Sequence, residues 1–294
     1  MPRLSHEELS SRHLGMGSTD VVEACGLAPW VGAGPMRLFC TKLGIASPDA
    51  EEDLDEDKED QFEWGHTMEP VILGWYATKH GANVLPGGHV PHPSIPWLWA
   101  SLDATVLGAS RIVEQKCVSS PALYSHWDES SQDGIPRYVR AQVTIAMSCH
   151  GAREAHVVAS VGGRPPHVWE VAYDEELASL LIEGAGRFWQ LVTDGTPPAM
   201  DHTSASKEYL RHKFPSNGDR VIEDATDQEN VLGLTRISAA MREGLAKKEK
   251  NKIDAELMAL VGNRAGIKGS GWSFTWKTGD DGKRRQRFTA RGVE

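Results

Sequence analysis

The chain has 294 residues, of which 40% are hydrophobic and 24% are charged, and its formal net charge is −10. This is the composition of a globular protein, which excludes a disordered or fibrous chain. No apolar run approaches the roughly 20 residues that span a bilayer, and the first residues lack the apolar core of a signal peptide. We therefore expect a cytoplasmic protein that has no membrane partner.

The negative charge is concentrated in one segment. Residues 49–63 contain ten acidic residues and one lysine, a net charge of −9, so the other 279 residues carry only −1. Residues 247–291 contain twelve basic and five acidic residues, a net charge of +7. Because charge runs are usually solvated, an acidic loop is expected over 47–61, and the basic stretch is either a solvated or subunit-packing appendage or a surface for phosphate groups.

The spacing of apolar residues predicts a mixed α/β core, in which a central sheet is flanked by helices. The expected helices, in chain order, are two short ones within 17–44 that are broken at Pro29–Pro35, then 61–80, 136–150 and 174–194. The expected strands are 97–106, 111–118, 154–162 and 166–172.

After Pro198 the pattern changes. Residues 226–262 are expected to form one long helix or a helical hairpin, and residues 262–291 a basic β-hairpin that turns at Asp280-Asp281-Gly282. We therefore expect a core domain over 1–200 and a C-terminal helical and hairpin extension over 201–294.

Three charged residues fall on two neighbouring expected strands. Asp103 lies near the end of the first strand, and Glu114 and Lys116 share one face of the second, because side chains alternate across a strand. Two carboxylates, a backbone carbonyl and water would suit Mg²⁺, which can polarise a phosphoryl oxygen and activate water. Alone, the pattern is weak, because Glu-x-Lys on a strand is commonly a solvated pair.

Four segments are more specific when they are taken together. They are residues 12–30 (RHLGMGSTDVVEACGLAPW), 64–70 (WGHTMEP), 100–103 with 114–116 (ASLD and EQK) and 136–143 (PRYVRAQV). In order and spacing they resemble the lambda-exonuclease-like (YqaJ) phage recombinase nucleases, a branch of the PD-(D/E)XK nuclease superfamily, over about residues 10–200 of this chain. Two positions depart from the family pattern, since Leu102 replaces a proline and His66 replaces a small or neutral residue.

The resemblance implies a metal site with five contributors. Asp103, Glu114 and the backbone carbonyl of Gln115 would bind Mg²⁺, for which Mn²⁺ would substitute. Glu69, directly before a proline in its helix, would reach the metal directly or through a water. Lys116 would activate or position the attacking water, the alternative being a salt bridge to one of these carboxylates.

The resemblance also implies residues that contact the substrate. Gln142 would hydrogen-bond near the metal-bound water or the scissile phosphate, and Tyr138, one helical turn earlier, would line the site or serve a structural role. Arg12 would face a 5′-terminal phosphate, which a guanidinium can bind bidentately. Thr19 and Ser18 would add donors to that phosphate at the start of a helix.

The activity that the resemblance implies is that of a metal-dependent deoxyribonuclease, a 5′–3′ exonuclease on linear duplex DNA. The 3′ overhang would pass to a single-strand annealing protein in phage-type recombination, inside a bacterial host cell and with a phage or prophage origin. A homo-oligomer is expected, with a trimer favoured. Two alternatives stay open, an endonuclease or structure-specific nuclease with the same metal site, and a non-catalytic scaffold that binds DNA ends.

Overall fold

The computed structural model describes residues 12–30, 32–45, 56–119, 121–131, 133–215, 224–279 and 281–290. They belong to two compact units, Met1–Asn217 and Gly218–Glu294. Within the described ranges, no helix combines the length and the apolar character needed to cross a membrane.

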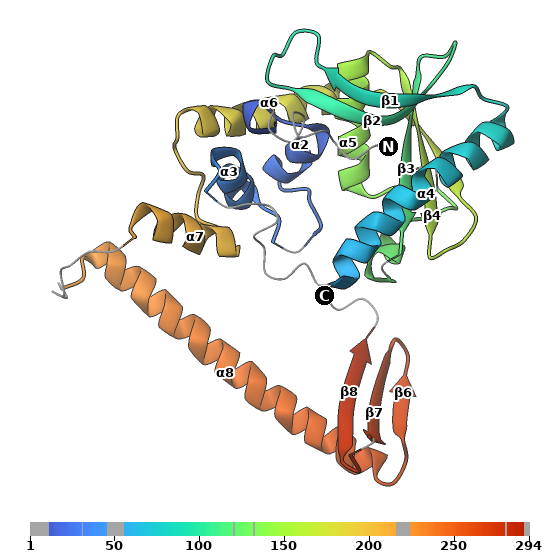
Figure 1. Cartoon of the computed structure of the whole chain (residues 1–294). Coiled ribbons are helices and arrows are strands. Elements are labelled where there is room, and N and C mark those ends of the chain that lie inside the picture. The colour runs from blue at the N-terminus through green and yellow to red at the C-terminus, as the bar shows by residue number, and fades with distance from the viewer. Residues whose placement is uncertain are drawn as a thin grey trace. The chain divides into compact units, whose positions relative to one another are not determined.

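The first unit is built around a five-stranded mixed sheet (Figure 1). Its strands, which lie side by side in chain order, are β1 (Val84–Pro91), β2 (Trp99–Val106), β3 (Arg111–Val118), β4 (Glu154–Val161) and β5 (His167–Ala172). Neighbouring strands are antiparallel except β3 and β4, which are parallel. A parallel pair needs a long crossover, and this one contains helix α5 (Arg137–His150).

Helices cover both faces of the sheet. Helix α4 (Glu56–His80) packs against β3 and β4 on one face, as Figure 1 shows, and α5 packs on the other. Helices α2 (Ser18–Ala24) and α6 (Glu175–Thr193) pack on α5. Helix α3 (Pro35–Leu43) packs on α2, and α7 (Ser204–Lys213) packs on α3. Two short 3-10 helices, η1 (Arg12–Leu14) and η2 (Pro121–His126), complete this unit.

Each face of the sheet has its own hydrophobic core. The core beneath α4 contains Ile72 and Tyr76 of the helix and Val113 and Val158 of the sheet. The larger core fills the space between the sheet and the helices α2, α5 and α6. Because β3 is covered on both sides, its residues are buried in succession rather than alternately.

The segment that leads into α2 is fastened to the start of β2. Met16 forms a parallel bridge with Leu98, and its N–H donates to the carbonyl of Trp97 at 2.6 Å. Gly15 is required at this approach, because a Cβ there would lie 2.5 Å from the Trp97 carbonyl oxygen. The N-terminal motif is therefore held close to the strand that carries Asp103.

The acidic loop expected over 47–61 is wrong at its C-terminal end. Helix α4 begins at Glu56, so residues 56–61 are helical, whereas residues 46–55 lie outside the described part of the chain. The reason is that acidic side chains in the first turn of a helix interact favourably with the helix dipole. An acidic run can therefore begin a helix.

Three elements have no counterpart among the expected ones: β1, α7 and the short strand β6 (Gly266–Gly269). β1 contains Pro86, Gly87 and Gly88, which weaken its strand pattern. Gly87 is needed there because a Cβ would lie 2.0 Å from the carbonyl oxygen of Leu102.

The second unit consists of one long helix and a three-stranded sheet. Helix α8 (Asp227–Val261) is a single helix and not a hairpin of two, and it begins with a capping box between Thr226 and Glu229. β6, β7 (Trp272–Thr278) and β8 (Arg284–Ala290) form an antiparallel meander. Helix α7 belongs to the first unit, and the domain boundary near residue 200 stays a prediction.

Candidate functional site

Asp103 and Glu114 lie where the pairing of β2 with β3 ends. The two strands are paired at Ala104–Val113 and Thr105–Ile112, one residue before the two acidic positions. Beyond this point the N–H of Gln115 donates to Oδ2 of Asp103 at 2.8 Å. The Asp103 carboxylate thus takes the place of a backbone acceptor and stays beside β3.

Glu114 is the centre of a hydrogen-bonded cluster. Its side chain is only 3% exposed, and its Oε1 accepts from Nζ of Lys116 at 2.5 Å and from Nε2 of Gln142 at 2.8 Å. Gln142 comes from α5, and the other two residues come from β3. With Asp103 of β2, the structure therefore brings together four of the predicted site residues, from two strands and the crossover helix.

The acidic groups of the cluster affect one another. Burial raises the pKa of the Asp103 carboxyl well above its usual range, and the nearby charges of Glu114 and Glu69 raise it further. The ammonium of Lys116 and the N–H of Gln115 oppose this rise. Negative charge is thus crowded into a poorly solvated place, which is the electrostatic setting that favours a bound cation.

Lys116 is held as an ammonium by its neighbours. Burial alone would lower its pKa, but the carboxylates of Glu114 and Asp103 outweigh burial and the pKa of Lys116 is raised. Tyr138 lies near this charge. Burial raises the pKa of the Tyr138 phenol, and the ammonium of Lys116 partly opposes that rise. Tyr138 also packs edge to face against Trp30, with ring centroids 6.2 Å apart. It therefore lines the cluster and packs against the loop that follows α2.

Glu69 approaches the cluster from α4, on the opposite side of the sheet from α5. It is 7% exposed and lies inside the helix, directly before Pro70. Proline cannot donate to the carbonyl four residues earlier, so the helix lacks a bond next to Glu69. The charge of Glu69 raises the pKa of the Asp103 carboxyl, after the larger effects of burial and of Glu114.

The predicted phosphate-binding residues lie at the N-terminal motif. Arg12 begins η1, and its side chain lies outside the described part of the structure. Ser18 is buried and Thr19 is exposed at the start of α2. Asp20 occupies the helix N-terminus, because its Oδ2 accepts from the N–H of Gly17 at 2.8 Å and from Nζ of Lys42 at 2.6 Å.

The donor set of the cluster fits a hard divalent cation. Within the described residues, no hydrogen bond reaches Oδ1 of Asp103 or Oε2 of Glu114. Each carboxylate therefore keeps one oxygen for a ligand, and carboxylate and carbonyl oxygens are what Mg²⁺ and Mn²⁺ prefer. Asp103, Glu114, Glu69 and the Gln115 carbonyl are the atoms that would hold the ion.

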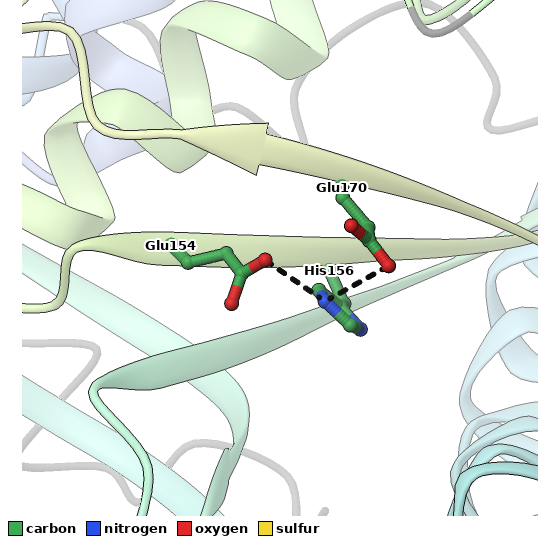
Figure 2. Close-up of side chains that lie close together, drawn as sticks. All are labelled: Glu154, His156 and Glu170. Atoms are coloured by element: carbon green, nitrogen blue, oxygen red, sulfur yellow. Dashed lines mark hydrogen bonds and ion pairs between the residues drawn. The ribbon is translucent and has the colours of Figure 1, made fainter.

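A second polar cluster lies on the α4 face of the sheet. Glu154, His156 and Glu170 form the one group of three acidic or histidine side chains in the described chain whose ligand atoms all lie within 4.8 Å of one another (Figure 2). Nε2 of His156 lies 3.3 Å from Oε1 of Glu154 and 3.9 Å from Oε1 of Glu170. The predicted metal ligands Asp103, Glu114 and Glu69 are less tightly gathered than this.

The partners of the second cluster identify it as a structural link. Arg111 binds Oε2 of Glu154 at 2.7 Å, and the hydroxyl of Tyr76 lies 2.8 Å from Nδ1 of His156. Burial lowers the pKa of His156, and Arg111 lowers it further against the opposing effect of Glu154. A neutral His156 between Tyr76 and Glu154 joins α4 to β4, with both ring nitrogens satisfied.

No pattern in the sequence groups these residues. Glu154 and His156 show the two-residue spacing of one strand face, but Glu170 and Tyr76 join them only when β5 and α4 are in place. Asp20 was likewise missed, although an acidic residue three positions after Gly17 is typical of a capping box.

The fold and the first cluster together define a class of protein. A mixed sheet that carries Asp on one strand and Glu-x-Lys on the next, with a glutamine from the crossover helix, is the arrangement of the PD-(D/E)XK nucleases. Residues 9–153 match the family model of the YqaJ-like viral recombinase domain, so this part of the chain is similar to that family. The resemblance seen in the sequence is therefore confirmed.

Two known proteins share most of the chain with this one. The uncharacterized protein YqaJ of Bacillus subtilis (strain 168) is 25% identical over 260 residues, which are 85% of this chain and 77% of that protein. An alkaline exonuclease (LHK-Exo) from Laribacter hongkongensis is 20% identical with a TM-score of 0.51, and covers 71% of this chain and 97% of its own. Its complex with dAMP aligns with a TM-score of 0.50. The structural likeness shows that the fold is shared.

Proposed function

We propose that the chain is a Mg²⁺-dependent DNA exonuclease that hydrolyses one strand of linear duplex DNA from the 5′ end and leaves a 3′ overhang. The observation that carries the proposal is the convergence of Asp103, Glu114, Lys116 and Gln142, with free carboxylate oxygens on the first two. The match of residues 9–153 to the YqaJ-like viral recombinase domain supports DNA as the substrate.

Each side chain of the cluster has a separate task in this proposal. A Mg²⁺ ion held by Asp103, Glu114 and Glu69 would polarise the scissile phosphate and lower the pKa of a bound water. Lys116, as an ammonium, donates hydrogen bonds and so orients the attacking water and does not deprotonate it. Gln142 holds Oε1 of Glu114 and thereby fixes the direction of its other oxygen.

The direction of digestion depends on the N-terminal motif. Arg12 and Thr19 are proposed to bind a 5′-terminal phosphate, with Ser18 contributing through its backbone because its side chain is buried. The bridge from Met16 to Leu98, directly before the strand that carries Asp103, supports this assignment. A phosphate bound there would set which end of the strand is cut. The Laribacter hongkongensis alkaline exonuclease, whose structure holds dAMP, is consistent with release of mononucleotides.

The product determines the partners. A 3′ single-stranded overhang is the substrate of a single-strand annealing protein, so we propose such a partner in phage-type recombination. We also propose a homo-oligomer, a trimer by preference, that encloses the duplex. Light scattering of the purified chain at several concentrations would give the mass, and a monomer throughout would contradict this part of the proposal.

The decisive experiment compares three DNA substrates in the presence and absence of Mg²⁺. They are end-labelled linear duplexes with a 5′-phosphate, the same duplexes with a 5′-hydroxyl, and closed circles. The proposal expects digestion of linear DNA only, with the 5′-phosphate preferred, and only with the metal. Cleavage of closed circles would indicate an endonuclease, and intact linear DNA with either Mg²⁺ or Mn²⁺ would indicate a DNA-end-binding scaffold.

A further inference from the structure

The three-stranded sheet of the second unit has two unlike faces. Residues directly opposite one another in an antiparallel sheet share a face, so the register assigns every side chain. One face carries Ile267, Trp272, Phe274, Trp276 and Phe288, which include all the aromatic residues of the sheet. We call the other the outer sheet face; its members are Gly266, Lys268, Ser273, Thr275, Lys277, Arg285, Arg287 and Thr289.

The aromatic face packs in part on α8. β7 packs on the end of α8, where Phe274 is completely buried and Val261 is 1% exposed. Nε2 of Gln286 donates to Oδ2 of Asp254 on α8 at 3.0 Å. Figure 1 shows the sheet at the C-terminal end of this helix. On the aromatic face Phe288 stays 51% exposed, whereas on the outer sheet face it is the basic residues that are exposed.

The outer sheet face has the chemistry of a phosphate-binding surface. Lys268, Lys277, Arg285 and Arg287 are all exposed, and the uncharged members of the face are hydroxyl residues and one glycine. It has no acidic residue of its own; Asp281, in the turn, makes an ion pair with Arg285 at 2.7 Å. An exposed pair of this kind is weak, so the face remains strongly positive.

Arg284 shows that the basic residues of β8 are not interchangeable. Its guanidinium donates to the carbonyls of Gly262 and Arg264 at 2.7 Å and lies 3.8 Å above the ring of Trp276. It therefore fastens the sheet to the end of α8. Lys268, Lys277 and Arg287, in contrast, make no ion pair among the residues that the structure describes.

We infer that the outer sheet face binds the phosphate backbone of duplex DNA, without regard to sequence, as a second DNA contact separate from the nuclease cluster. Lysine, arginine and hydroxyl side chains are the groups that bind phosphate in protein–DNA complexes. Proteins that hold single strands instead stack bases on aromatic side chains, and this face offers none. A duplex is therefore the ligand that its chemistry favours.

This inference goes beyond the proposed function, because it requires no cleavage. A contact along the duplex, and not at its end, would keep the chain near the DNA between hydrolytic steps. Failure of the nuclease proposal would leave the binding surface intact, and loss of the surface would leave the metal cluster intact. The two can therefore fail separately.

The test measures binding of the full chain to a fluorescent blunt duplex by anisotropy, in EDTA, from 50 to 200 mM salt. The sheet variant replaces Lys268, Lys277, Arg285 and Arg287 with glutamine and keeps Arg284. A matched control replaces four exposed lysines of α8 with glutamine, namely Lys247, Lys248, Lys250 and Lys252. Both variants lose four positive charges from the same unit. Circular dichroism checks folding, and a gel checks that the DNA stays intact.

Each phosphate contact contributes about −0.9 to the slope of log K against log salt. The sheet variant is therefore expected to flatten the slope by about 3 to 4. The ratio of wild-type to variant affinity should accordingly be about 100-fold larger at 50 mM than at 200 mM salt. The α8 control should keep the wild-type slope, and an unlabelled closed circle should compete with the duplex. Equal effects in both variants, or an unchanged slope in the sheet variant, would overturn the inference.

Two further arms cover other outcomes. If the fourfold sheet variant is misfolded, the single variants K277Q and R287Q decide, because each should flatten the slope by about 0.9. A single-stranded oligonucleotide of the same length should bind more weakly than the duplex to the sheet. If the sheet variant loses affinity only for the single strand, duplex DNA is the wrong partner and the inference is overturned.

Discussion

The backbone N–H of Gln115 donates to Oδ2 of Asp103 at 2.8 Å. In an extended strand the N–H and the carbonyl of one residue point to the same side, so the Gln115 carbonyl also faces Asp103. The bond therefore fixes a carboxylate and orients a carbonyl toward the same place. This is the geometry required if Asp103 and the Gln115 carbonyl are to share one ion.

Substitution of D103N or E114Q is expected to abolish cleavage without loss of DNA binding. Each change removes the charge of a proposed metal ligand but keeps its shape, and several kcal/mol of transition-state stabilisation depend on the metal. We expect the cleavage rate to fall at least about 100-fold. Digestion of labelled linear duplex measures the rate, and anisotropy measures binding.

D133N is the matched control for these changes. Asp133 is 88% exposed in its side chain and pairs with Arg140 at the surface, so its loss should leave cleavage unchanged. Near-normal rates in D103N or E114Q would show that the metal site has been placed on the wrong residues.

Gln142 is proposed to act through Glu114, as a positioning residue. Replacement by leucine keeps the volume but removes the donor 2.8 Å from Oε1 of Glu114. Partners of metal ligands typically contribute 10- to 100-fold to metal affinity or activity. We therefore expect the Q142L variant to need about 10-fold or more Mg²⁺ for half-maximal cleavage.

The titration of activity with Mg²⁺ separates this role from a general loss of stability. Q190L serves as a control, because Gln190 donates to Asp194 on the exposed side of α6. A Q142L variant with a lower maximal rate but the wild-type requirement for Mg²⁺ would contradict the positioning role.

The preference for a 5′-phosphate should depend on Arg12. Replacement of Arg12 by alanine removes the proposed bidentate contact, so the ratio of digestion rates on 5′-phosphate and 5′-hydroxyl ends should fall toward one. The loss should lie mainly with the phosphorylated end. R187A, at an exposed arginine of α6 that pairs with Glu183, should keep the wild-type ratio, and an unchanged ratio in R12A would remove Arg12 from the phosphate site.

The metal-site strands could be predicted because their signal is local. Asp103, Glu114 and Lys116 sit on strands whose alternation is visible in the sequence, and the crossover helix with Gln142 follows in regular helical spacing. The bond from Gln142 to Glu114, however, depends on how α5 lies across the sheet, which periodicity does not determine.

Other parts of the fold could not be predicted from the sequence, for physical reasons. β1 has prolines and glycines in place of strand formers, and it is a strand because it pairs with β2 over its whole length. The sequence pattern over α8 fits either one long helix or a hairpin of two, since Gly233 and Gly244 weaken a helical pattern. Assigning side chains to the two faces of the second sheet requires the register of β6, a strand that the sequence pattern does not predict.

Glu23 joins α2 to α3 through a buried ion pair with Arg37. It is 3% exposed, accepts from Nε of Arg37 at 2.8 Å, and accepts from the N–H of Gly34 at 3.0 Å. Replacement by alanine would leave both donors without this partner, and breaking a buried pair costs about 3–5 kcal/mol. Because Arg37 is 18% exposed, we expect a loss of about 2–3 kcal/mol in urea unfolding.

The E183A variant is the control for this loss. Glu183 pairs with Arg187 at an exposed site on α6, where such a pair contributes about 0–1 kcal/mol. Equal destabilisation by E23A and E183A would show that burial adds nothing to the Glu23 pair.

Protonation of His156 should destabilise the fold at mildly acidic pH. Its pKa lies below the usual 6.5 because of burial and the nearby Arg111, although Glu154 and Glu170 oppose the shift. The unfolded chain therefore takes up a proton at a higher pH than the folded chain does. Stability linked to this group is complete above about pH 6.5 and falls as the pH drops toward the folded pKa, by at most about 1.4 kcal/mol per pH unit.

Urea midpoints measured between pH 5 and 8 would detect this linkage. The chain has twelve histidines, so the difference between the wild type and H156Q isolates the contribution of this one. H156Q should be less stable at pH 7.5, because Tyr76 and Glu154 lose a shared partner, and the gap should narrow as the pH falls below 6.5. H150Q removes an exposed histidine at the end of α5 and is the control for loss of an imidazole at the surface. A gap that widens in acid for H156Q would mean that His156 is protonated in the folded protein, and that it acts as an ion-pair partner of Glu154 and Glu170.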